Sequence, residues 1–201
     1  MDTKLNRFIL RVCFWVPKLV YLNILWAIHA LPLITLVPST RALIRSILYF
    51  QTNTETTGIR AVFTVYFKEN TYFSRKKEWL YSLYFWLILI DYWVLNPETF
   101  IGASIRIALL LFCLLSSFIL VYQTLLSHNQ DRSISFFFAF FSFLRNPWIA
   151  LGHVVLTVSG FLLLLSFSPA LLIFSGMSIL LFCNLQYLQA LPKKHLFSFE
   201  K

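Results

Sequence analysis

Two oppositely charged residues flank a short uncharged turn within an apolar part of the chain. Asp91 and Arg106 stand about six and nine residues from its centre near Asn96 and Pro97. On antiparallel helices with a rise of 1.5 Å per residue, the two residues come within about 3 Å of the same depth. Charges inside a membrane are functional candidates because they are costly to bury. We predict a structural ion pair; a substrate or proton site and the absence of contact are the alternatives.

Other polar residues within apolar segments could bind ions or carry protons. No second histidine, cysteine or carboxylate stands at metal-ligand spacing near His29 or His153, so packing or hydrogen bonding is the preferred interpretation for both. We expect Asn23 to form a hydrogen bond with a neighbouring helix. Asn184 and Gln186 form a polar patch on the last apolar segment, which could line a conduit.

The residues that enzymes of known type require are missing from the sequence. There is no phosphate-binding glycine loop, no G-x-S-x-G or H-E-x-x-H motif, and no pair of carboxylates on one segment. The three cysteines, Cys13, Cys113 and Cys183, have apolar neighbours and no metal or redox spacing. We therefore predict a protein that is not an enzyme and that carries no cofactor or metal.

The composition indicates an integral membrane protein. Of the 201 residues, 59% are hydrophobic and 12% are charged, whereas soluble domains carry about 25% charged residues. We explain the net charge of +9 by basic residues in cytoplasmic loops, where they lie beside anionic lipid. No basic patch is interleaved with exposed aromatic residues, so we expect no nucleic-acid partner. We expect a single all-α domain, residues 1–201, that forms a polytopic transmembrane helical bundle.

Five apolar segments predict transmembrane helices, because about 20 apolar residues cross a hydrocarbon core about 30 Å thick. One of them contains Pro32, which we expect to kink the helix rather than end it. The predicted spans are Leu19–Val37, Trp79–Leu95, Ile107–Leu126, Trp148–Phe167 and Ala170–Leu191.

Lysine and arginine are unevenly distributed among the connections. The segments 96–100 and 166–169 contain none, whereas 51–78 contains five and 127–147 contains two. The first 18 residues carry four, and the tail after Leu191 carries three. Because basic residues gather in cytoplasmic loops, we predict a multi-pass protein of the bacterial cell membrane with both termini in the cytoplasm.

Two cytoplasmic termini require an even number of crossings, so a sixth crossing is needed. The segment Ser39–Gln51 is the one candidate, with Ser39 as the predicted N-cap. A helix of this length measures roughly 20 Å and contains Arg41 and Arg45. We favour six crossings with a short second helix; a re-entrant hairpin is the alternative.

Two more segments mix aromatic and basic residues and predict cytoplasmic interfacial helices: Ile59–Glu78 and Ser135–Arg145.

Several residues in the first third of the chain form a recognisable signature. These are Asn23, Leu25, Trp26, Leu31, Pro32, Thr35, Pro38, Thr40, Ala42 and Leu43. Downstream, the segment with Phe63, Phe67 and Asn70 and the helix that begins near Asn146 add weaker matches. In these features the chain resembles the YesL-like family of small bacterial membrane proteins, whose domain has no assigned function. It departs from the family at Val37, where relatives have glycine, and at Arg41 and Arg45.

The resemblance implies a link to carbohydrate use, because such proteins are often encoded beside sugar-uptake transporters and polysaccharide-degrading enzymes. It implies no reaction and no catalytic residues. We expect a non-catalytic accessory or scaffold component of carbohydrate uptake, in contact with the lipid bilayer and with sugar-transporter subunits or copies of itself. A small oligomeric permease is the alternative. A permease needs a central cavity lined by polar groups, whereas an accessory protein has its buried polar groups already paired.

Overall fold

The protein is helical throughout the residues that its computed structural model describes, which are 3–53, 58–73, 75–96, 98–130 and 134–191. No strand occurs among these residues, which confirms the predicted all-α class. The elements are α1 (Thr3–Ala30), the 3₁₀ turn η1 (Leu33–Thr35), α2 (Leu36–Thr52), α3 (Ile59–Phe73), α4 (Arg75–Val94), α5 (Phe100–Gln130), α6 (Phe136–Arg145), α7 (Pro147–Phe167) and α8 (Pro169–Ala190).

Pro32 ends the first helix instead of kinking it, which corrects the predicted span Leu19–Val37. Proline has no N–H to donate and moves the preceding residue out of the helical conformation. Accordingly α1 stops at Ala30, and a turn leads into α2. The Thr35 hydroxyl stabilises this turn by donating to the carbonyl oxygens of His29 and Pro32, at 2.5 and 2.7 Å.

Ser39 is not the N-cap of the second helix, because α2 begins three residues earlier. Its hydroxyl is buried and donates to the Leu36 carbonyl at 2.9 Å. Pro38 lies in the first turn, where a backbone N–H has no partner within the helix. The neighbouring N–H of Val37 donates instead to the Ser82 hydroxyl of α4 at 3.1 Å. A tertiary contact therefore provides the partner for a backbone N–H in the first turn of this helix.

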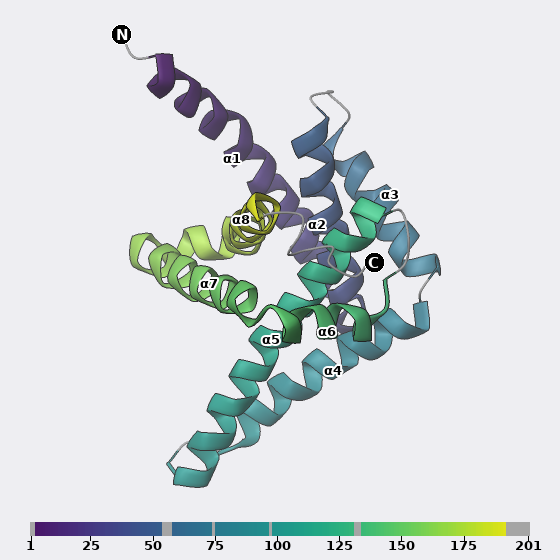
Figure 1. Ribbon diagram of the computed structural model, residues 1–201, viewed down its shortest axis with the longest axis vertical. Coiled ribbons are helices and arrows are strands. Elements are labelled where there is room, and N and C mark those ends of the chain that lie inside the picture. Colours follow the sequence, from purple (N-terminus) through teal and green to yellow (C-terminus); the bar gives the residue numbers. More distant parts are fainter. Residues whose placement is uncertain (1–2, 54–57, 74, 97, 131–133, 192–201) are drawn as a thin grey trace.

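The hydrophobic core is built around α2, which packs against α1 and α3 (Figure 1). Leu43 and Ile47 are fully buried, and residues of α5 and α8 such as Leu125 and Leu185 complete the same cluster. The segment 59–78, predicted as one interfacial helix, is divided between α3 and the first turn of α4. The core therefore joins elements from both halves of the chain.

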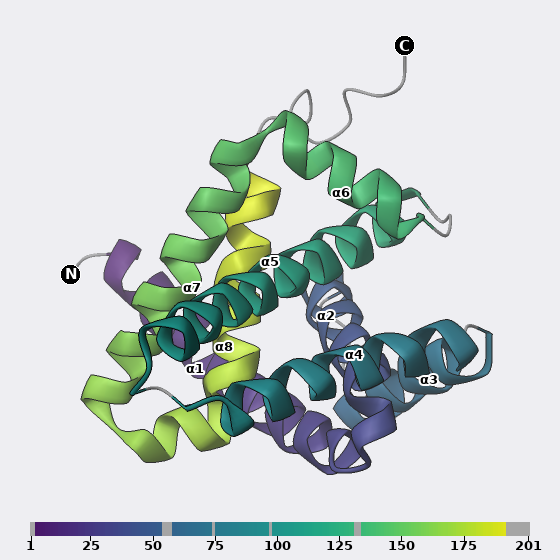
Figure 2. The same cartoon turned by 90° about the horizontal axis from the view of Figure 1, so that it is seen from below.

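The second half of the chain forms two helical hairpins. The end of α4 and the start of α5, which the turn near Asn96 joins, extend away from the rest of the molecule (Figure 1). The helices α7 and α8 lie side by side, and α6 joins the end of α5 to the start of α7 (Figure 2). Gly152 permits the close approach of α7 and α8, because a side chain there would clash with the Tyr187 hydroxyl.

Three described helices are long and apolar enough to cross a membrane: the Val12–Ala30 part of α1, the Phe100–His128 part of α5, and α7. Large apolar side chains such as Ile101, Leu111 and Leu163 are exposed on α5 and α7. Such surfaces suit contact with lipid chains. A membrane protein with transmembrane helices is therefore supported.

Candidate functional site

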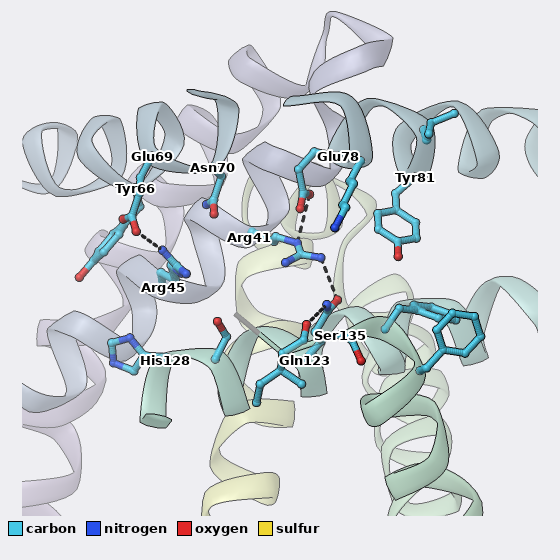
Figure 3. A pocket seen from close by; sticks show the side chains of 16 residues that line it. Arg41, Arg45, Tyr66, Glu69, Asn70, Glu78, Tyr81, Gln123, His128 and Ser135 are labelled. Carbon is cyan, nitrogen blue, oxygen red and sulfur yellow. Dashed lines mark hydrogen bonds and ion pairs between the residues drawn. The ribbon is translucent and has the colours of Figure 1, made fainter. Parts of the chain in front are cut away.

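Arg41 is the centre of a buried polar cluster formed by α2, α4 and α5. Its Nε lies 3.1 Å from Glu78 Oε2, and its Nη2 donates to Gln123 Oε1 at 2.8 Å (Figure 3). The side chains of Arg41 and Glu78 are only 13% and 4% exposed. Gln123 in turn donates from Nε2 to the backbone carbonyl of Ile134 at 2.6 Å. One guanidinium thus connects three helices and, through Gln123, the segment before α6.

Arg45 follows one helical turn later and shares this face of α2, because residues four apart in a helix are neighbours. Its Nη1 lies 3.0 Å from Glu69 Oε1 of α3 (Figure 3). Its Cζ stands 5.9 Å from the ring centroid of Tyr66. The Glu69 side chain is 47% exposed, so this second ion pair borders solvent whereas the first is enclosed.

The two arginines line a cavity of about 960 Å³, which we call the polar cavity. Three donors in its wall, Arg41 Nε, Arg45 Nε and Asn70 Nδ2, have no hydrogen-bond partner among the described residues, although Arg41 Nε belongs to the ion pair with Glu78. Asn70 is only 9% exposed and faces the cavity between α2 and α3 (Figure 3). The lining comprises Arg41, Arg45, Tyr66, Glu69, Asn70, Lys77, Glu78, Leu80, Tyr81, Gln123, Ser127, His128, Ile134, Ser135, Phe136 and Phe137.

Burial has the largest influence on the pKa values of Glu78 and Tyr66 in the wall of the polar cavity. It raises the pKa of the Glu78 carboxyl above its ordinary value of 4.5, and the Arg41 and Arg45 guanidinium groups oppose part of that rise. Burial likewise raises the pKa of the Tyr66 phenol, again against the effect of Arg45. Both shifts disfavour the ionised form of the group concerned.

An apolar chamber of about 510 Å³ adjoins the polar cavity between α4, α5 and α6. The two spaces share Arg41, Tyr81, Gln123, Phe136 and Phe137. The other residues of the chamber are mostly aromatic or aliphatic: Tyr84, Phe85, Phe112, Leu115, Ser116, Ile119, Leu120, Phe140 and Phe141. A polar compartment and an apolar one therefore meet at the side chain of Arg41.

The structure does not bring Asp91 and Arg106 together. Asp91 is exposed, and the Arg106 Cζ lies 5.0 Å from the ring centroid of Tyr92. Among the described residues there is no ion pair between them. Equal depth on two antiparallel helices does not make two side chains face each other, because the rotation of each helix about its own axis also matters.

The signature residues mostly pack α1, α2 and α3 against one another. Trp26 Nε1 donates to Thr40 Oγ1 at 3.1 Å, and the ring of Phe67 lies 4.7 Å from that of His29. Asn23 Oδ1 accepts from the Ser178 N–H of α8 at 3.2 Å. Pro32 and Thr35 form the turn before α2, Pro38 lies in the first turn of α2, and Asn70 lines the polar cavity.

The remaining polar candidates lie apart from the polar cavity. His153 is 2% exposed, with its ring 4.9 Å from that of Phe118. Asn184 donates to Thr157 Oγ1 at 3.1 Å, whereas Gln186 is exposed on another face of α8. The predicted patch on α8 is therefore divided between the interior and the surface. In the described parts of the chain, no cluster of three or more potential metal ligands occurs.

Sequence reasoning missed Glu69, Glu78 and Gln123. A usable signal was present, because Arg41 and Arg45 stand four residues apart in an apolar helix and each requires a counter-charge. The sequence contains only eight acidic residues, so Glu69 and Glu78 were among few possible partners. Their identity depends on how α3 and α4 pack against α2, which local spacing does not reveal.

The arrangement can hold a ligand that is rich in hydrogen-bond acceptors. Its wall offers guanidinium groups and an amide donor, and the neighbouring chamber offers a surface of aromatic rings.

A comparison of the chain with protein-family models, curated proteins and solved structures finds no match.

Proposed function

We propose that the protein is a non-catalytic, multi-pass protein of the bacterial cell membrane, and that it serves as an accessory or scaffold component of carbohydrate uptake. The pairing of Arg41 with Glu78 and Gln123 carries this proposal. These charges are buried and already engaged in joining helices, as an accessory protein requires. The link to carbohydrate comes from the resemblance of residues 21–43 to the YesL-like family.

The experiment that tests this role is purification of the tagged protein from its native membranes in mild detergent, followed by mass spectrometry. We expect a membrane subunit of a sugar transporter in near-stoichiometric amount. An unrelated tagged membrane protein of similar size and positive charge serves as the control. Failure to recover a transporter subunit, or equal recovery with the control, contradicts the accessory role.

The alternative function is a small oligomeric permease, and the polar cavity is the observation that favours it. Uptake of radiolabelled sugar into proteoliposomes distinguishes the two functions. A permease alone produces saturable uptake that Arg41→Met abolishes. An accessory protein produces uptake only when the transporter is reconstituted with it.

We further propose that both termini are cytoplasmic and that α1 and α2 form a re-entrant hairpin, with crossings by α4, α5, α7 and α8. Two contacts support this topology: Val37 with Ser82, and Arg41 with Glu78. They hold the first turns of α2 beside the first turns of α4, next to the basic connection at 51–78 that the distribution of charge assigns to the cytoplasm.

The alternative topology has six crossings, and the length of α2 supports it. Its 17 residues measure about 25 Å, more than the sequence suggested. Labelling of single cysteines on intact cells separates the two topologies once the native cysteines are replaced. A cysteine at Ile34 is labelled from outside only if α2 crosses. Asn96 and Ser168 serve as positive controls, and labelling at Thr54 or Arg75 contradicts both topologies.

A further inference from the structure

The polar cavity and the apolar chamber form one elongated site with two chemically different ends. They share the side chains of Arg41, Tyr81, Gln123, Phe136 and Phe137. A ligand that fills both must be amphiphilic, because a small polar solute gains no favourable contact in a chamber lined by aromatic rings. Membrane lipids have this form.

The polar end is suited to an oxyanion. Arg45 Nε and Asn70 Nδ2 are buried donors without a partner, and Asn70 is nine-tenths buried while facing the cavity (Figure 3). Leaving such donors unsatisfied is unfavourable, and a phosphate oxygen would accept from them in charge-assisted hydrogen bonds. Arg41, Arg45 and Lys77 also outnumber Glu69 and Glu78 in the wall.

The distance along the site corresponds to one leaflet of a bilayer. Gln123 lines the polar end and Phe112 the apolar end, eleven residues apart on α5. That separation is about 16 Å along the helix, roughly half of a hydrocarbon core about 30 Å thick. The polar end also includes Ser127, His128 and Ser135 from the connection whose basic residues assign it to the cytoplasm.

We propose that this site binds an anionic phospholipid of the cytoplasmic leaflet, with its phosphate in the polar cavity and an acyl chain in the apolar chamber. A soluble phosphate ester would leave the chamber unfilled. A zwitterionic lipid would bring an ammonium group toward the two arginines. Phosphatidylglycerol meets both requirements and serves as the probe.

Native mass spectrometry of the protein in mild detergent tests the proposal, with phosphatidylglycerol and phosphatidylethanolamine of identical chains added in turn. We expect wild-type protein to retain one phosphatidylglycerol with about tenfold preference, because both lipids carry the phosphate but only phosphatidylethanolamine brings an ammonium group beside Arg41 and Arg45. Arg45→Gln should remove the preference. Arg60→Gln, an exposed arginine of α3 outside the cavity, should keep it.

A second pair of variants tests the apolar end. Leu120→Trp fills the chamber and should abolish retention of the long-chain lipid. Leu110→Trp places the same ring on an exposed position of α5 and should leave retention unchanged. Glycerol phosphate is added as a competitor to separate a lipid site from a site for a soluble phosphate ester.

Three results would overturn the proposal: equal retention of the two lipids, equal effects of the Arg45 and Arg60 variants, or full displacement of phosphatidylglycerol by glycerol phosphate. If Arg45→Gln does not fold, Asn70→Asp replaces it. This change keeps the side-chain shape but adds a negative charge, so it should expel phosphatidylglycerol, and unchanged retention contradicts the phosphate site.

Discussion

Two regions of this molecule place an arginine and an acid on neighbouring helices, with opposite results. Around Arg41, helices from distant parts of the chain converge, and the Glu78 carboxylate is withdrawn from solvent and paired. At the outer end of the α4–α5 hairpin, Asp91 is exposed, and Arg106 lies over an aromatic ring. Pairing occurs where several helices exclude water. At the outer end, where α4 and α5 meet without further helices around them, similar depth is insufficient.

The largest effect should come from removing the central guanidinium. Arg41→Met leaves the Glu78 carboxyl buried without its ion-pair partner and breaks the hydrogen bond to Gln123. Breaking a buried pair in this way costs about 3–5 kcal/mol, so the thermal unfolding temperature in detergent should fall markedly. Arg60→Met on the exposed face of α3 is the control. An equal, small change in both variants would show that the Arg41 pair does not stabilise the fold.

A smaller loss of stability is expected when the link from α2 through Gln123 to the segment before α6 is removed. Gln123→Leu leaves an Arg41 N–H and the Ile134 carbonyl without their partner, which costs about 1–3 kcal/mol. Gln186→Leu on the exposed face of α8 should have little effect on the unfolding temperature. The prediction is wrong if the two variants unfold at the same temperature.

Lowering the pH should restore part of the stability that Arg41→Met loses. Burial raises the pKa of Glu78, and without Arg41 the pKa rises further. Between its ordinary and raised pKa values the folded state binds more protons than the unfolded state, so stability increases as pH falls through that interval. Each pKa unit is worth about 1.4 kcal/mol.

Unfolding temperatures of the wild type and Arg41→Met, measured from pH 8 to pH 5, check this expectation. The difference between them should narrow toward pH 5. A constant difference would mean that Glu78 does not take up a proton when it loses Arg41. The double variant Arg41→Met/Glu78→Gln provides the control, because its loss should not depend on pH in this way.

The smallest effects are expected at the outer hairpin. Asp91→Ala and Arg106→Ala should each change stability by less than about 0.5 kcal/mol, as is usual for surface positions. The double variant should show the sum of the two changes, since residues without contact behave independently. Recovery of stability in the double variant would reveal a direct ion pair and would remove the contrast between the two regions.

Much of the helical framework could be predicted from local sequence. The predicted segments Trp148–Phe167 and Ala170–Leu191 correspond to α7 and α8 within one residue at each end. Continuous apolar runs bounded by Asn146, Pro147, Ser168 and Pro169 explain this success. The start of α2 was misplaced because Ser39 has the chemistry of an N-cap, whereas contact between Val37 and Ser82 fixes the helix start.

Local sequence was enough to indicate that this protein is helical and apolar and where α6, α7 and α8 begin and end, because these features depend on neighbouring residues. Tertiary structure alone decided which charges meet. Arg41 finds Glu78 and Gln123 because α4 and α5 pack against the same face of α2, and helix rotation and crossing are set by the packing of the whole core. The same packing leaves Asp91 and Arg106 apart and creates the two adjoining cavities.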